Sequence, residues 1–262
     1  MRQIYGNPYN RMIIKRTQFE HKPPIKWHQF TQGRWNMDSR YRHEVKHEIT
    51  YADMTELRQR LSAVARPDPH APDGRYHIRS LYFDTPDDKA LREKVMGTNR
   101  REKFRIRYYN GDTSMIRLEK KSRVNGLGTK YNAMMTARQV EDILCGDTSW
   151  MLDSSEDLIR ELYCKMNYQI LRPRTIVDYM REPYVFRAGN VRVTFDYDIR
   201  TALSVHDFLN PDCLGIKAGQ DDPIILEVKW DDFLPGIIRD CVQLGNRHAT
   251  AFSKYARCRI YG

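Results

Sequence analysis

Charged and apolar side chains alternate along several short stretches of this 262-residue chain. Successive side chains of a β-strand point to opposite faces of the sheet, so each stretch would have one charged and one apolar face. The charged faces read Glu44, Lys46 and Glu48; Lys103, Arg105 and Arg107; Arg117, Glu119, Lys121 and Arg123; Tyr179 and Arg181; Arg192, Thr194, Asp196 and Asp198; and Glu227 and Lys229. This pattern predicts a sheet built from both halves of the chain.

The remaining pattern indicates antiparallel strands with helices between them. Strands are predicted over residues 42–49, 77–84, 101–109, 114–123, 129–135, 175–181, 184–187, 191–198 and 224–230. Asn110 and Gly111 favour a hairpin turn between two of them. Helices are predicted over residues 51–66, 86–96, 137–144, 155–166 and 235–246, with Thr50 and Thr136 as N-caps. We therefore expect an α+β fold of about eight to ten antiparallel strands with flanking helices, arranged as a closed barrel or as a pair of facing sheets.

Composition and residue patterns limit the classes of protein to which this chain can belong. Residues 1–40 have neither a strand nor a helix period and are interpreted as an extension, so the domain is expected at 41–262. The net charge is +10, which favours a polyanionic partner. No stretch reaches the roughly 18 apolar residues of a membrane span, and no apolar leader is expected at the start. Five cysteines without a CxxC pair favour a reducing, cytoplasmic location.

The charged faces admit two interpretations. For a single strand, a face turned to water explains the pattern as well as any other. Across six strands, Arg and Lys interleaved with single carboxylates favour a charged interior, with the apolar faces packed outward against helices. Without a ligand, such a charged interior costs folding free energy, because like charges repel and lose hydration. A bound multivalent anion with a divalent cation would offset that cost. Removal of Arg105 and Arg107 would then be expected to raise the stability of the ligand-free protein.

The residue types on these faces suit phosphate chemistry. Arg matches phosphate oxygens bidentately and Lys supplies a point charge. Carboxylates supply the hard oxygen ligands that Mg²⁺ and Mn²⁺ take together with substrate phosphates. In phosphoryl transfer, positioning and charge neutralisation do most of the catalysis. The histidines are interpreted as packing or surface residues, and the cysteines as core residues.

Seven short motifs, in order, resemble those of the VTC domain. They are Arg42-His-Glu-Val-Lys46, Ser80-Leu-Tyr-Phe-Asp-Thr-Pro86, Lys103-Phe-Arg-Ile-Arg107, Leu118-Glu-Lys-Lys121, Val191-Arg-Val-Thr-Phe-Asp196, Leu226-Glu-Val-Lys229 and Phe252-Ser-Lys-Tyr255. That domain belongs to the triphosphate tunnel metalloenzymes, and its eukaryotic form is the catalytic part of a polyphosphate polymerase. The resemblance, over residues 41–257, implies an antiparallel β-barrel tunnel of about eight strands with flanking helices. Its basic walls would take ATP or another nucleoside triphosphate, a divalent cation (Mn²⁺ or Mg²⁺) and inorganic polyphosphate.

The resemblance also implies roles for single residues. Phosphate-binding positions match Lys46, Arg105, Arg107, Lys121, Arg181, Arg192 and Lys254, with Ser253 beside the last. Glu227 matches the metal-binding glutamate. From the strand faces we add Glu119 and Glu44 as further metal ligands. The same faces add Lys229, Arg123 and Tyr179 as substrate-binding residues.

Two departures and several alternatives stay open. Arg42 stands where the wider superfamily has the first Glu of Glu-x-Glu-x-Lys, which favours a polymerase over a simple triphosphatase or cyclase. Ala251 stands where the family often has a basic residue. A triphosphatase or polyphosphatase and a non-catalytic polyphosphate-binding module are the alternatives on the same fold. A nucleic-acid-binding protein is the remoter alternative, but few aromatics lie on the charged faces, so no nucleic acid partner is expected. A membrane-protein partner and the oligomeric state are left open.

Overall fold

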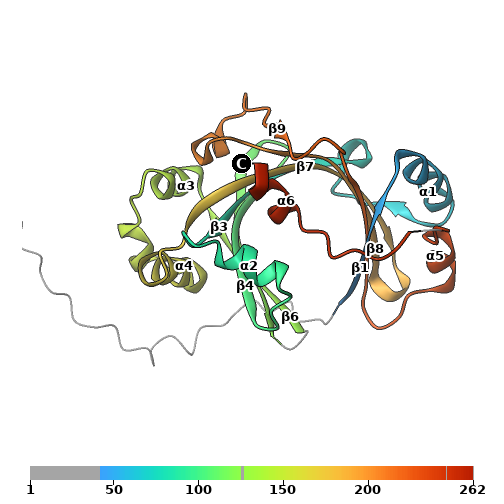
Figure 1. The fold of residues 1–262 in the computed structure, drawn as a ribbon, viewed down its shortest axis with the longest axis horizontal. Helices are drawn as coiled ribbons and strands as arrows, with labels where there is room; N and C mark the ends of the chain where they lie inside the picture. The colour runs from blue at the N-terminus through green and yellow to red at the C-terminus, as the bar shows by residue number, and fades with distance from the viewer. Residues whose placement is uncertain (1–41, 125–126, 246, 262) are drawn as a thin grey trace, which may run out of the picture. The chain divides into compact units, whose positions relative to one another are not determined.

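The computed structural model describes residues 42–124, 127–245 and 247–261. The predicted extension at residues 1–40 lies outside them. The described residues form one sheet of antiparallel strands with helices against it (Figure 1). In pairing order the strands run β1-β10-β8-β7-β3-β4-β5-β6, with the short β2 and β9 paired to β7 and β8. The predicted fold class is confirmed, with eight strands along the pairing path.

The strand bounds follow the alternation in the sequence. The strands are β1 His43–Ile49, β2 Arg66–Pro67, β3 Tyr76–Asp84, β4 Arg101–Tyr109, β5 Asp112–Val124, β6 Leu127–Met135, β7 Arg172–Phe186, β8 Val191–Thr201, β9 Ile216–Lys217 and β10 Ile224–Trp230. The turn between β4 and β5 is made by Asn110 and Gly111, both with positive φ (52° and 74°). Such a pair suits the right-handed twist of a hairpin, as predicted.

The helices are α1 Tyr51–Val64, α2 Lys89–Val95, α3 Ala137–Leu144, α4 Asp157–Tyr168, α5 Gly236–Cys241 and α6 Lys254–Tyr261, with short 3₁₀ turns η2 Pro72–Gly74, η3 Ser149–Asp153, η4 Ala188–Asn190 and η5 Val205–Leu209. Both predicted N-caps are present. Thr50 exchanges hydrogen bonds with Asp53, and Thr136 exchanges them with Gln139. These capping boxes fix where α1 and α3 begin.

Two stretches differ from the prediction. Residues 172–186 form one strand rather than two, because β7 changes partner along its length. It pairs with β3 up to Arg181, and beyond Pro183 it pairs with β2. The Pro183 carbonyl still accepts a hydrogen bond from the Asp68 amide at 3.1 Å, so this proline does not end the strand. Near the C-terminus the predicted helix at 235–246 ends at Cys241, and the predicted tail forms α6 instead.

The apolar strand faces pack outward against helices, as predicted. One core lies between β3–β6 and the helices α3 and α4, around Ile106, Leu118 and Leu162. A second lies between β1, β8 and β10 and the helices α1 and α5, around Phe195 and Leu226. In Figure 1 these two pairs of helices cover opposite flanks of the curved sheet. The charged faces therefore point to the other side, which we call the concave face.

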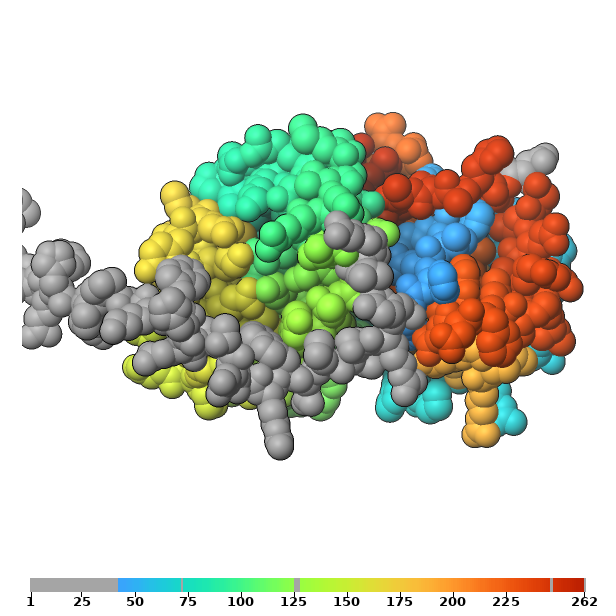
Figure 2. Space-filling model, turned by 90° about the horizontal axis from the view of Figure 1, so that it is seen from below, coloured from blue at the N-terminus to red at the C-terminus, as the bar shows by residue number. Residues whose placement is uncertain are grey.

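The curl of the sheet brings distant parts of the chain together. β1 pairs with β10 along its whole length, from His43 opposite Trp230 to Ile49 opposite Ile224. Figure 2 shows these blue N-terminal residues beside the red C-terminal part of the chain. β1 and β6 end the pairing path and do not pair with each other within the described residues. The sheet is thus a curled, open form of the predicted barrel. α6 lies on its concave face under β7 and β8 (Figure 1).

Candidate functional site

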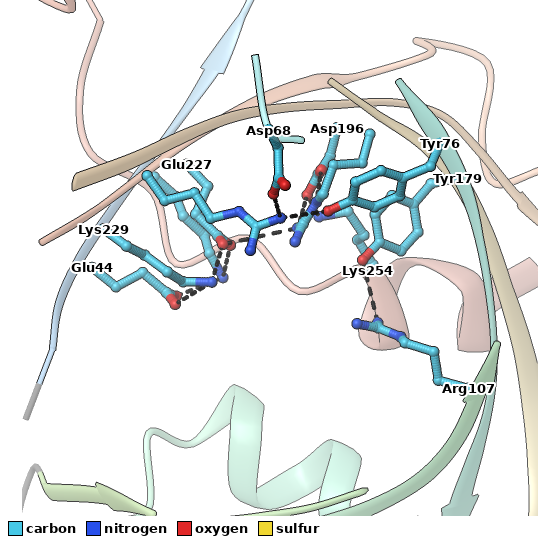
Figure 3. Close-up of polar contacts among 12 residues, drawn as sticks. Glu44, Asp68, Tyr76, Arg107, Tyr179, Asp196, Glu227, Lys229 and Lys254 are labelled. Atoms are coloured by element: carbon cyan, nitrogen blue, oxygen red, sulfur yellow. Dashed lines mark hydrogen bonds and ion pairs between the residues drawn. The ribbon is translucent and has the colours of Figure 1, made fainter. Parts of the chain in front are cut away.

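Strand register brings the charges of β1 and β10 into one cluster. Lys46 lies opposite Glu227, and Glu44 lies opposite Lys229. The Lys46 ammonium is 2.8 Å from Glu44 Oε1 and 3.3 Å from Glu227 Oε2, and Lys229 also contacts both carboxylates. Figure 3 shows Glu44, Glu227 and Lys229 of this cluster converging on one side of the concave face. The sequence prediction that these four residues share a face is confirmed.

Glu227 is the buried centre of this cluster, with only 4% of its surface exposed. Burial alone would raise the pKa of its carboxyl. Lys229, Arg181 and Lys46 outweigh that effect and hold the pKa well below its usual value. Glu227 is therefore ionised at neutral pH. In the same way burial opposes the charge of Lys46, but Glu227 and Glu44 raise its pKa.

A second buried carboxylate, Asp196 on β8, binds two of the predicted basic residues. Arg181 donates to both of its oxygens at 2.6 and 2.7 Å, and Lys254 of α6 contacts one of them. Asp196 is fully buried, and the two cations hold its pKa below the usual value against the effect of burial. Ser253 accepts a hydrogen bond from the Ala256 amide at 3.3 Å and so caps the helix that carries Lys254.

Arg192 is oriented from outside its own strand. Its guanidinium donates to Asp68 Oδ2 at 2.7 Å and to the Tyr76 hydroxyl at 2.6 Å. Figure 3 shows Asp68 and Tyr76 meeting at this point. Asp68 is buried, at 6% exposure, in the loop that follows β2. The loop thus fixes one end of the concave face.

On the other half of the concave face, Arg105 of β4 pairs with Glu119 of β5. Arg105 Nε is 2.6 Å from Glu119 Oε2, and Lys130 of β6 lies 2.6 Å from Oε1. Glu119 is 1% exposed. Arg105 also donates to the Tyr82 hydroxyl at 2.9 Å. Burial would raise the pKa of Tyr82, but Arg105 and Arg107 outweigh it and lower the pKa to about 8.

Arg107 is buried, with 5% exposure, and its hydrogen bonds go to neutral groups. It donates to Ser80 Oγ at 2.8 Å and to the Tyr179 hydroxyl at 3.2 Å. The Tyr179 ring has Lys254, Arg181 and Arg107 around it, at 4.7, 5.4 and 5.9 Å from its centroid. Cation–π attraction therefore holds three predicted phosphate-binding side chains around one ring.

Lys121 and Arg123 continue this face along β5. The positive charge of Arg105, followed by removal of the Lys121 ammonium from water, holds the pKa of Lys121 well below its usual value. Lys229 of β10, across the concave face from β5, repels the ammonium too. Lys121 thus lies between the two halves of the concave face. Arg123 lies opposite Arg101 of β4.

The carboxylates differ in how well they suit a divalent cation. Within the described residues the buried Glu227 Oε1 accepts no hydrogen bond of good geometry, although the Lys229 ammonium lies against it, and Oγ1 of Thr194, opposite Glu227 on β8, has no hydrogen-bond partner. Glu44, next to both, is 40% exposed in its side chain. Two hard oxygen donors of this kind fit Mg²⁺ or Mn²⁺ bound together with substrate phosphates. Both oxygens of Glu119 are engaged by Arg105 and Lys130, as those of Glu227 are by Lys46 and Lys229, but Arg105 also donates a hydrogen bond of good geometry to Glu119.

Larger donor sets do not occur in the described part of the chain. There, no three His, Cys, Asp or Glu side chains converge on one position. A cation at Glu227 would therefore need oxygen atoms from its substrate.

A cleft of 880 Å³ lies elsewhere, between Thr50 at the start of α1, Tyr197 on β8 and the segment before β10. None of the predicted phosphate-binding residues lines it.

The family model of the VTC domain matches residues 41–260. The chain belongs to the VTC domain family. Its match spans every described strand and helix but the last residue of α6. The family resemblance of the sequence is thereby confirmed. Comparison with curated proteins gave no significant match.

Solved structures similar to this VTC domain share little sequence with it. A candidate adenylyl cyclase from Hippeastrum, described as having a dominant triphosphatase activity, has 13% identity and a TM-score of 0.49, covering 83% of this chain and 95% of its own. A candidate adenylate cyclase from Bacillus halodurans has 12% identity and a TM-score of 0.46, covering 74% and 81%. The PH1012 protein of Pyrococcus horikoshii has 13% identity and a TM-score of 0.44, covering 83% and 98%.

The structure of this VTC domain adds residues that the sequence analysis did not single out as site residues. Asp196 had been placed on a charged face but given no role, and it binds two of the predicted cations. Asp68, Tyr76 and Ser80 orient Arg192 and Arg107. Ser80 lies in one of the quoted motifs, so the sequence offered a reason to assign it to the site. Asp68 lies in a loop, where strand alternation cannot indicate which way a side chain points.

None of the helices in the described ranges combines the length and apolar character that crossing a bilayer would need. The longest, α1, has 14 residues and only three of them are buried apolar side chains.

Proposed function

We propose that this VTC domain is a metal-dependent phosphotransferase that moves the γ-phosphate of ATP, or of another nucleoside triphosphate, onto inorganic polyphosphate. The observation that supports this most is the concave face, where Arg and Lys side chains from β1, β4, β5, β7, β8, β10 and α6 surround a few ionised carboxylates. A face of this kind suits a polyanion with a bound divalent cation better than it suits a neutral substrate.

In this proposal the triphosphate lies between the two halves of the concave face. Lys46 and Lys121 approach it as point charges, and Arg105 and Arg107 offer planar forks. Arg107 is buried and bound to Ser80 and Tyr179, and the partly buried Arg105 is bound to Glu119, so both guanidinium groups are oriented before substrate binds. Orientation in advance lowers the entropy lost on binding.

The transfer step needs no strong base. A terminal phosphate oxygen of the acceptor chain forms a bond to the γ-phosphorus while the bond to the β,γ-bridging oxygen breaks, so that ADP leaves and the chain gains one phosphate. The acceptor oxygen is already ionised at neutral pH. Arg181, Arg192 and Lys254 stabilise the charge on the equatorial oxygens. Lys229, Arg123, Tyr179 and Ser253 support binding along the same face.

Glu227 and Glu44 are the residues that we assign to the divalent cation. Bound there, Mg²⁺ or Mn²⁺ would neutralise charge on the β- and γ-phosphate oxygens. Glu119 stays a predicted ligand, but its pairing with Arg105 and Lys130 favours a role in orienting Arg105.

A triphosphatase is the second candidate, and Tyr82 favours it. Hydrolysis needs a group that accepts a proton from water, and this phenol, with its pKa of about 8, lies within hydrogen-bond distance of Arg105. The acceptor is then water instead of polyphosphate, and free phosphate is the product.

A cytoplasmic location and a membrane-protein partner for the product stay predictions.

One experiment separates the two candidates. The purified protein is incubated with ATP and Mn²⁺, the product is run on a polyphosphate gel, and free phosphate is assayed in parallel. A polyphosphate ladder is expected, and Lys254→Ala should abolish it. Arg138→Ala is the matched control, because Arg138 on α3 has 82% of its side chain exposed and lies outside the concave face.

Other outcomes decide against the proposal. Free phosphate without a ladder, lost in Tyr82→Phe, would establish the triphosphatase. No product at all, with tripolyphosphate still raising the melting temperature, would leave a polyphosphate-binding module on this fold.

A further inference from the structure

The cations of the concave face fall into two groups. In the centre, Lys46, Arg105 and Arg181 each contact a carboxylate. At the end of the face next to α2, four cations have no carboxylate within ion-pair distance in the described ranges. We call these four the α2 cation cluster: Lys94, Arg101, Lys103 and Arg123.

Three elements build the α2 cation cluster. Arg101 and Arg123 lie directly opposite each other on β4 and β5, and Lys103 lies one inward-facing position further along β4. α2 packs against β4, beside α6 (Figure 1), and brings Lys94 to the same place. Burial, then the charges of Arg101, Lys46 and Arg123, lower the pKa of Lys94. These cations are therefore close enough to repel one another.

The cluster also faces the site. Lys46, which repels Lys94, is the residue that binds Glu227 on β10. The α2 cation cluster is thus continuous with the centre of the concave face. It differs from the centre because its cations form no ion pair within the described ranges, although Glu93 of α2 acts on Arg101 from beyond ion-pair distance. Like charges left without partners cost folding free energy, and a bound anion offsets that cost.

We propose that the α2 cation cluster binds the distal phosphates of a linear polyphosphate, beyond those held at the centre of the site. The inference rests on the proposed function and adds a direction to it: the chain runs from Glu227 toward α2. A triphosphate satisfies the centre, and only a longer anion reaches Lys94 and Arg101. The protein should therefore prefer long chains over short ones.

A nucleic acid strand fits this surface less well. Sequence-tolerant binding of single strands uses free aromatic rings on which bases stack. The rings beside the cluster, Tyr82 and Tyr255, are stacked on each other with centroids 5.1 Å apart, and Tyr255 is 2% exposed. Polyphosphate carries the same charge and has no bases to place.

The test compares two ligands on two double variants. Affinities for tripolyphosphate and long-chain polyphosphate are measured by calorimetry for the wild type, Lys94→Gln/Arg101→Gln and the control Arg138→Gln/Arg239→Gln. The control removes the same charge from α3 and α5, where the two side chains are 82% and 70% exposed. Melting temperatures check folding, and the single variant Lys94→Gln repeats the comparison.

We expect the long-chain preference, the ratio of the two affinities, to fall at least tenfold in Lys94→Gln/Arg101→Gln and to keep its wild-type value in the control. The salt dependence of long-chain binding should also weaken, by about one unit of slope or more for two lost contacts. An unchanged ratio, or tighter binding of a single-stranded DNA of equal charge, overturns the inference alone. A wild type that binds neither phosphate ligand overturns the proposed function as well.

Discussion

Lys103 of β4 and Lys121 of β5 lie directly opposite each other on the concave face. Like charges at opposed positions of a sheet repel, and neither lysine has a carboxylate within ion-pair distance in the part of the chain that the structure describes. Burial, together with Lys94 and Arg101, lowers the pKa of Lys103 to about 8. The ligand-free protein therefore holds these protons weakly.

Phosphate binding should depend on pH because of Lys103. A bound phosphate raises the pKa of this ammonium above its free value of about 8. Above that pH, binding must take up a proton, so affinity falls as pH rises, by up to about tenfold per pH unit for one proton. Calorimetry with tripolyphosphate between about pH 7 and pH 10 should show this fall, and Lys103→Met should flatten it.

Tyr82 titrates in the same range and acts in the same direction. Its pKa is also about 8, and its phenolate would add negative charge beside the ligand. Tyr82→Phe is therefore measured beside Lys103→Met, so that the two contributions are separated. Identical slopes in the wild type and in Lys103→Met would show that this lysine does not face the bound phosphate.

Glu227→Gln should remove both metal-dependent turnover and part of the stability. The amide leaves Lys46, Lys229 and Arg181 beside a neutral group, which costs about 1–3 kcal/mol. Glu48→Gln is the control, because Glu48 lies on the same face of β1 and is exposed. Urea unfolding gives the free energies, and the gel assay gives turnover.

The stability lost in Glu227→Gln should itself depend on pH. A carboxyl whose pKa is depressed in the folded state adds stability above its unfolded pKa, and that stability is lost as pH falls toward the folded pKa. The difference between wild type and Glu227→Gln should therefore be constant near neutrality and shrink below about pH 4. A difference that does not change with pH would mean that Glu227 is not held ionised by its neighbours.

The arrangement of the strands followed closely from the sequence. Alternation placed Lys103, Arg105 and Arg107 on one face and Phe104 and Ile106 on the other, because side-chain direction in a strand repeats every two residues. The helix N-caps and the Asn-Gly turn also predicted where several helices and strands begin or end. Each of these features depends on residues that are close together in the sequence, so it can be predicted from the sequence.

The pairing of charges could not be predicted in the same way. Which carboxylate meets which cation depends on register between strands far apart in the chain, as when Asp196 binds Arg181 and also Lys254 of α6. The role of Asp68 depends on a loop that has no period. The curl that leaves β1 and β6 without a pairing to each other in the described residues is likewise a property of the whole sheet.

Arg105→Met should lower the stability of the ligand-free protein and Arg107→Met should not, although the sequence alone predicted that both arginines destabilise it. Removing Arg105 leaves the buried Glu119 with Lys130 as its ion-pair partner, at a cost of about 3 kcal/mol. Among the described residues Arg107 forms no ion pair and bonds to neutral groups such as Ser80 and Tyr179, so methionine removes a buried charge without leaving an opposite one. Urea unfolding without ligand should show a loss for the first variant and no loss, or a gain, for the second. Equal losses would mean that Arg107 is as well neutralised as Arg105.

Asp196→Asn should loosen α6. Asp196 joins β8 to Lys254 at the start of this helix and also holds Arg181, so the neutral amide leaves two cations close together. Hydrogen–deuterium exchange in α6 should therefore rise, and tripolyphosphate should reverse the rise because it neutralises both cations again.

Asp88→Asn is the matched control for this experiment. Asp88 pairs with Arg259 at the other end of α6, away from the predicted phosphate-binding residues. Its loss should raise exchange in α6 in a way that tripolyphosphate does not reverse. If the ligand lowers exchange equally in both variants, Asp196 anchors the helix without orienting Lys254 and Arg181 for phosphate.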